Sequence, residues 1–170
     1  MAADKISLVE LFERHVLYEV WMLVETYNRL EAGVADRVVG NALIESFCIH
    51  ARALVDFFND RKGAKASSFA EPTYVSFAKG DIPDALKSKL STQIAHLTLT
   101  RTSNPAKKID RAARQELFLK IATELNNFLQ HLKPEYHALC PSDLKVRLSS
   151  VVTPAPSSSQ ATNAVTTTST

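Results

Sequence analysis

Residues 38–61 have the sequence VVGNALIESFCIHARALVDFFNDR, and this stretch decides the fold. At 100° per residue, four apolar side chains share one stripe of a helix, namely Leu43, Phe47, Leu54 and Phe57. His50 falls inside that stripe, where an imidazole needs a hydrogen-bond partner. We therefore predict one long, mostly buried helix over residues 36–60, with a polar group on its apolar face.

A helix predicted from Asp4 or Ser7 to about residue 31 has the same feature. Glu19 lies at the centre of its apolar stripe, one turn after His15. The stripe consists of Leu8, Phe12, Val16, Leu23 and Leu30. A carboxylate in such surroundings must be hydrogen-bonded, paired with a cation or protonated. Gly33 ends this helix, and the brief turn after it predicts an antiparallel hairpin with residues 36–60.

Two further apolar stripes predict a third and a fourth helix. The third opens at Asp81 with Pro83 and runs towards Arg101, and the fourth runs from residue 107 or 109 to residue 132. Between the second and third helices, residues 62–80 show no clear period. They form either a long loop or a segment that contains a short secondary-structure element. The expected fold is an all-α, antiparallel four-helix bundle with one long loop.

The chain divides into one expected domain, residues 1–148, and a tail, residues 149–170. Residues 143–148 are expected to form one short turn, capped at Pro141, Ser142 and Asp143. The tail has no charged or aromatic residue and is rich in Ser, Thr and Pro, so we expect it to be disordered.

Composition indicates an ordinary globular protein of 170 residues, with 45% hydrophobic residues. Twenty Lys and Arg against 18 Asp and Glu leave a net charge of +2, too small to indicate nucleic acid as a bulk electrostatic partner. Cys48 and Cys140 are too few for a disulfide framework, and no stretch resembles a signal peptide. We expect a soluble, cytoplasmic protein without a membrane partner.

The sequence contains none of the strong catalytic or cofactor motifs. It has no phosphate-binding glycine loop, no GxSxG, no HExxH and no cysteine cluster that would hold zinc. We therefore expect no cofactor and no metal.

The chemistry-bearing residues that remain are polar side chains on helical faces. We hypothesise a semi-buried cluster of Glu19, His50, His96 and Arg101, because a cation facing a helix bundle needs an anion. Arg114, at the start of the fourth inward face, could join it. The alternative interpretation is purely structural, with His50 and Glu19 each satisfied by an ordinary hydrogen bond inside the core.

Two helical segments, NALIESFCIHARALVDFF and IAHLTLTR, resemble bacterial proteins of the HEPN superfamily, which are small all-α bundles found in abortive-infection and toxin–antitoxin systems. The resemblance covers roughly residues 8–132. Ribonucleases of that superfamily carry an Arg, then four to six residues, then a His on one helix. Here His96 matches the histidine, Lys89 stands in the region where arginine belongs, and Arg101 follows the histidine. Lysine supplies charge without the bidentate guanidinium fork, so the catalytic motif is not intact.

Two functions follow from these residues and from the resemblance. In the first, the protein is a helical interaction module that forms a homodimer or binds a protein partner, within a bacterial defence or stress-response system. In the second, it is a metal-independent ribonuclease in which His96 is the general acid or base and Arg101 and Lys89 hold the phosphate. A basic stretch that starts at Arg101 would suit RNA, although a solvated helix start explains it as well. We expect the interaction module and keep the ribonuclease as the alternative.

Overall fold

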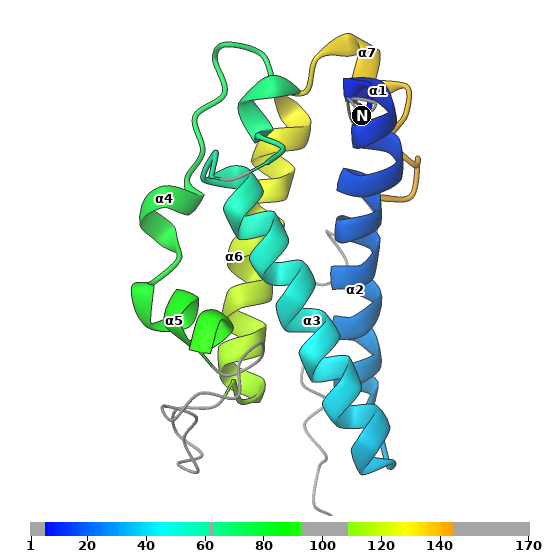
Figure 1. The fold of residues 1–170 in the computed structure, drawn as a ribbon, viewed down its shortest axis with the longest axis vertical. Helices are drawn as coiled ribbons and strands as arrows, with labels where there is room; N and C mark the ends of the chain where they lie inside the picture. The colour runs from blue at the N-terminus through cyan, green and yellow to red at the C-terminus, as the bar shows by residue number, and fades with distance from the viewer. Residues whose placement is uncertain (1–5, 62, 93–108, 145–170) are drawn as a thin grey trace, which may run out of the picture.

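The computed structural model describes residues 6–61, 63–92 and 109–144, and in these ranges the secondary structure is helical, without a β-strand. Three long rods lie side by side, and two short helices, α4 and α5, cover one flank (Figure 1). The all-α class is thus confirmed. The tail predicted for residues 149–170 lies outside the described residues, as does most of the turn predicted for 143–148.

The first rod is continuous but not uniform. It begins after Ser7, whose hydroxyl accepts a hydrogen bond from Glu10 N at 3.1 Å. It comprises α1 (Leu8–Leu11), a π-helical turn η1 (Phe12–Val16) and α2 (Leu17–Ala32). Gly33 then ends it with φ +90°, a conformation that side chains disfavour. The predicted bounds are close to these, whereas the π-helical turn has no counterpart in the sequence-based prediction.

The second rod is α3 (Arg37–Phe58), which agrees with the predicted range to within two residues. The Asp36 carboxylate caps it by accepting hydrogen bonds from Val38 N and Val39 N, both at 2.8 Å. Its inward face buries the predicted aromatic side chains together with His50. Helix α3 therefore places the polar side chain of His50 in the interior, as its periodicity indicates.

Residues 63–80 hide short elements instead of forming an open loop. They contain the 3₁₀ turn η2 (Ala66–Ser68) and the short helix α4 (Ala78–Asp81). An antiparallel bridge joins Ala70 to Leu132, with Glu71 N donating to His131 O at 2.7 Å. The segment is thereby attached to the end of the third rod.

The third predicted helix starts later than expected. We predicted that Asp81 opens it, but Asp81 is the last residue of α4, and Ile82 is extended at φ −89° and ψ 111°. Helix α5 (Asp84–Thr92) begins only after Pro83. The prediction of the start was wrong because a proline disfavours the helical conformation of the residue before it. Residues 93–101 of the predicted helix lie outside the described residues.

The third rod is α6 (Arg111–Gln130), capped by Asp110 and followed by a short helix that we did not predict, α7 (Pro134–His137). Tyr27, late in α2, stacks on Phe118, early in α6, with ring centroids 4.0 Å apart. Phe58 and Phe128, near the ends of α3 and α6, are 5.9 Å apart. Hence α6 runs antiparallel to the first rod and in the same direction as α3, as Figure 1 also shows.

Candidate functional site

Glu19 and His50, the two polar residues on apolar helical stripes, meet between the first rod and α3. His50 Nδ1 lies 2.6 Å from Glu19 Oε2, although 31 residues separate them. An ionised carboxylate can only accept, so Nδ1 carries the hydrogen and donates it to Glu19. About 10% of the His50 side chain and 30% of the Glu19 side chain remain exposed. The pair thus lies at the edge of the core, within reach of solvent on the glutamate side.

Tyr18 packs against the imidazole of His50. Its ring meets the His50 ring edge-on, with centroids 5.7 Å apart, and is itself about half exposed. Trp21, one turn later, is also half exposed, and its ring lies 6.3 Å from that of Tyr18. The half-exposed rings of Tyr18 and Trp21 thus lie beside the Glu19–His50 pair. A ligand or partner that reached this pair would contact these two rings.

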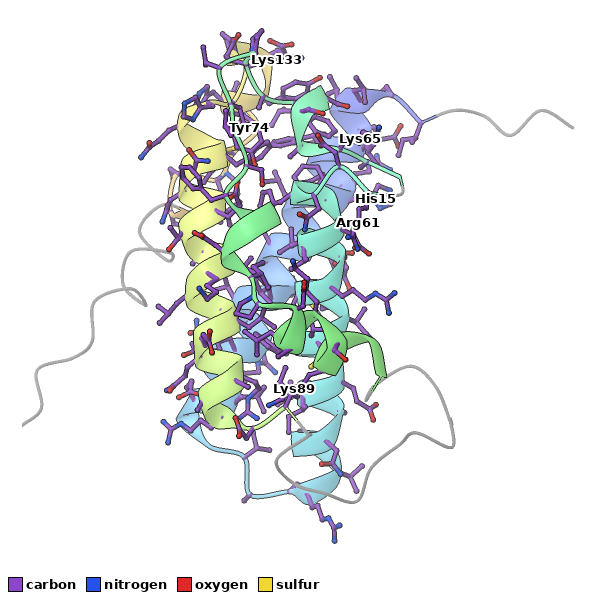
Figure 2. All side chains as sticks on the ribbon, turned by 90° about the vertical axis from the view of Figure 1, so that its left-hand side faces the viewer. His15, Arg61, Lys65, Tyr74, Lys89 and Lys133 are labelled. Carbon is purple, nitrogen blue, oxygen red and sulfur yellow. The ribbon has the colours of Figure 1, made fainter. Side chains whose placement is uncertain are left out.

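A hollow of about 240 Å³ opens on the first rod beside Glu19. Its walls include His15 and Glu19 from the first rod and Asp56 from α3, over a mostly apolar floor. His15 belongs to the π-helical turn, and such turns often mark functional positions. Figure 2 shows His15 in the same region as Arg61 and Lys65, and Ala64, the neighbour of Lys65, lines the hollow. The described residues contain no group of three or more side chains that could hold a metal ion.

The other predicted site residues do not join Glu19 and His50 in the part of the chain that the structure describes. Lys89 lies on α5, towards the opposite end of the molecule from His15 (Figure 2). His96 and Arg101 lie outside the described residues, so the cluster of four and the His96-based ribonuclease stay predictions. Arg114 is buried, its Nη1 donates to Ile109 O at 3.4 Å, and its Nε has no hydrogen-bond partner among the described residues.

A second polar cluster connects the end of α2 to the start of α6. Glu31 Oε2 accepts hydrogen bonds from Arg111 Nη2 at 2.8 Å and from Gln115 Nε2 at 3.2 Å. Burial, and then the charge of Glu31, raise the pKa of Tyr27 above its ordinary value. This cluster joins two rods at one end of the bundle. The sequence analysis did not identify it, because Glu31 lies 80 residues from Arg111 and 84 residues from Gln115.

Glu124 on α6, the most buried carboxylate among the described residues, is one that the sequence analysis missed. Its Oε2 accepts hydrogen bonds from Phe77 N at 2.6 Å and Ala78 N at 2.9 Å, and its Oε1 accepts from the Tyr74 hydroxyl. Burial and the hydrogen bond to Glu124 raise the pKa of Tyr74 far above its ordinary value. The sequence did contain an indication of this site, because Glu124 lies between Ile121 and Phe128 on the apolar stripe of its helix, just as Glu19 lies on the apolar stripe of the first rod.

Cys48 belongs to the core and not to a reactive site. It is almost fully buried, and that burial raises the pKa of its thiol to about 12. The thiolate is the nucleophilic form of cysteine, so this side chain is inert near neutral pH. Its sequence context, an apolar helical run, already indicates such a packing role.

Helix α3 is also the one described helix long and apolar enough to cross a membrane, judged by length and composition alone. The core helix of a soluble protein passes the same test, and α3 packs its inward face against the other two rods. The expectation of no membrane partner therefore stays a prediction.

Comparison of the chain with family models, with curated proteins and with solved structures finds no match. The resemblance to the HEPN superfamily therefore stays a prediction.

Proposed function

We propose that the protein is a helical interaction module that associates with a second copy of itself through the outer face of α2 and α3. One observation carries the proposal, the exposure of three large apolar side chains on this face. Tyr18, Trp21 and Ile49 are 47%, 50% and 57% exposed, and Ile49 directly precedes His50, on which Tyr18 packs. Exposed apolar side chains of this size are typical of protein interfaces, in which tyrosine and tryptophan are enriched.

The charges around these residues favour a second copy over a strongly charged partner. Each helix carries an ion pair of opposite signs on its outer side, Glu25 with Arg29 at 2.7 Å on α2 and Arg52 with Asp56 at 3.9 Å on α3. A two-fold interface places the same surface opposite itself, so a face with one dominant sign would repel its own copy. A face with balanced charges does not.

The Glu19–His50 pair supports the proposal by holding this face together. It joins the helix that carries Tyr18 and Trp21 to the helix that carries Ile49, through a contact of 2.6 Å. The register of the three apolar side chains therefore depends on a polar contact as well as on core packing. In a HEPN-like four-helix arrangement, which the resemblance implies, such a module would serve a defence or stress-response system.

Sedimentation velocity over a range of protein concentrations tests the proposal. The wild-type chain is expected to sediment as a mixture of monomer and dimer. The Ile49→Asp variant is expected to raise the dissociation constant of the dimer at least about tenfold, because burying one charge in the interface costs more than about 1.4 kcal/mol. The matched control is Val75→Asp, which changes an exposed apolar residue on the segment over α6. A monomer at every concentration, or equal association of wild type and Ile49→Asp, would overturn the proposal.

A further inference from the structure

The hollow beside Glu19 has the composition of a small-molecule site. It lies between the first rod and α3, and most of the side chains that line it are apolar. These apolar residues are Leu11, Val16, Ala53, Leu54, Phe57 and Ala64. Small-molecule sites are typically hollows of roughly 300–1,000 Å³ in which a few polar groups stand over an apolar floor. With a volume of about 240 Å³, this hollow admits only a small ligand.

The polar part of the lining carries negative charge. Glu19 and Asp56 are its two carboxylates, and His15 is the third polar side chain in the wall. The described residues that line the hollow include no lysine and no arginine. The lining is therefore net negative while His15 is neutral, and it favours a positively charged ligand.

Both carboxylates keep an oxygen for such a ligand. Glu19 uses Oε2 to accept from His50, and within the described part of the chain its Oε1 takes part in no hydrogen bond. Asp56 Oδ2 lies 3.9 Å from Arg52 Nε, which is too far for a hydrogen bond. A cation can thus approach either carboxylate while the contact between Glu19 and His50 stays intact.

Basic side chains near the hollow limit the charge of the ligand. Arg61 and Lys65 are exposed and lie in the same region as His15, but they do not line the hollow (Figure 2). Their charges are screened by salt over about 8 Å at physiological ionic strength, whereas the carboxylates in the wall contact the ligand directly. Because they repel cations at longer range, they disfavour a polyamine more than a ligand with a single positive charge.

We infer that this hollow binds a small organic monocation, a primary ammonium group on a short apolar body. The ammonium donates a hydrogen bond to Glu19 Oε1, close to the charge of Asp56, and the apolar body lies on Leu54 and Phe57. A hydrogen bond between two charged groups is roughly twice as strong as a neutral one, so the ammonium supplies the specificity. The site is independent of the proposed dimer, since Tyr18, Trp21 and Ile49 do not line the hollow.

NMR chemical-shift titrations of the full chain with n-hexylamine, n-hexanol and hexanoate test this inference. The three probes have the same number of carbon atoms and differ in charge. At about pH 8, with each probe raised to about 10 mM, hexylamine is expected to bind at least about tenfold more tightly than hexanol. The largest shifts are expected at the backbone amides of the residues that line the hollow.

Three variants assign the binding to the hollow. Glu19→Gln keeps an oxygen that accepts from His50 but removes the charge, so it is expected to weaken hexylamine binding about tenfold. Ala53→Phe fills the hollow without changing its charges and is expected to abolish the binding of hexylamine and hexanol alike. The matched control is Glu25→Gln, because Glu25 is as exposed as Glu19, at 31% and 30% of their side chains, and does not line the hollow. Its affinity for hexylamine is expected to equal that of the wild type.

Four results would overturn the inference. Equal binding of hexanol and hexylamine would mean that apolar contact alone explains the affinity. Tighter binding of hexanoate would mean that Arg61 and Lys65 set the charge preference. The other two are an absence of shifts around the hollow and equal losses of affinity in Glu19→Gln and Glu25→Gln. Ile49→Asp is expected to bind hexylamine as the wild type does whether or not the chain dimerises, so the site and the dimer fail separately.

Discussion

Glu124 and Glu19 both stand on the apolar stripe of a long helix, yet their surroundings differ. Glu124 is 1% exposed and accepts hydrogen bonds from three donors, all of them 46 to 50 residues earlier in the chain. Glu19 accepts one from His50, and 30% of its side chain remains exposed. A carboxylate whose oxygens are all occupied holds the structure together, whereas one with a single protein partner and access to solvent can also meet a ligand.

The comparison separates a structural clamp from a candidate site. The donors to Glu124 are Tyr74, Phe77 and Ala78, so this carboxylate holds the segment before α4 onto α6. Tyr74 can be followed in Figure 2, where it lies beside α6. The donor to Glu19 is the imidazole of His50, which comes from the neighbouring helix α3. We therefore expect Glu124 to contribute more to stability than Glu19, which remains open to a ligand or partner.

The largest effect is expected for Glu124→Ala. The substitution leaves one hydroxyl and two backbone N–H groups without their acceptor, and we expect it to lower the free energy of unfolding by about 3–5 kcal/mol. Urea unfolding followed by circular dichroism measures this. Glu116→Ala, an exposed glutamate on the same helix, is the control, with an expected change within about 0.5 kcal/mol. Equal losses in the two variants would show that the clamp does not stabilise the fold.

A smaller effect, with a pH signature, is expected for Tyr74→Phe. It removes one hydrogen bond to a charged group, so stability at neutral pH should fall by about 1.5–3 kcal/mol. The raised pKa of Tyr74 means that the unfolded chain ionises first, near pH 10, so the stabilisation is present below pH 10 and is lost as pH rises further. Wild type should thus approach Tyr74→Phe by up to about 1.4 kcal/mol per pH unit above pH 10. Parallel stability curves up to pH 11 would contradict this assignment.

The smallest effect is expected for the coupling between Glu19 and His50. A double-mutant cycle with Glu19→Ala and His50→Ala should give a coupling energy of about 1 kcal/mol, because only one hydrogen bond joins the pair and 30% of the Glu19 side chain is exposed. The Glu25–Arg29 pair on α2 is the control, and as an exposed ion pair it should give less than about 0.5 kcal/mol. A Glu19–His50 coupling as large as the loss in Glu124→Ala would remove the distinction between clamp and site.

The helices were largely predictable, because helical periodicity is a local property of the sequence. Helix α3 begins and ends within two residues of the prediction, and Ser7, one of two predicted caps, begins the first rod. The predicted start of α5 was wrong because we placed Pro83 inside the first turn of the helix. In the structure Pro83 lies before the helix and keeps Ile82 extended, so α5 begins at Asp84. The π-helical turn was not predictable, since nothing in the local pattern of residues 12–16 distinguishes it from an α-helix.

The candidate site was predictable only in part. The stripe positions of Glu19 and His50 showed that each needs a partner, and the same argument would have found Glu124. Which donor meets which acceptor depends on how the rods pack, and the partners lie 31 residues apart in one case and up to 50 in the other.

The sequence by itself determined that the described chain is helical, where its long helices lie and which carboxylates enter apolar faces, because these follow from the spacing of side chains along a single helix. Only the tertiary structure decided that Glu19 meets His50, that Glu124 holds the segment before α4, and that α3 and α6 run in the same direction. Those contacts join residues distant in sequence, and packing of the whole core, not local spacing, sets the distances between them.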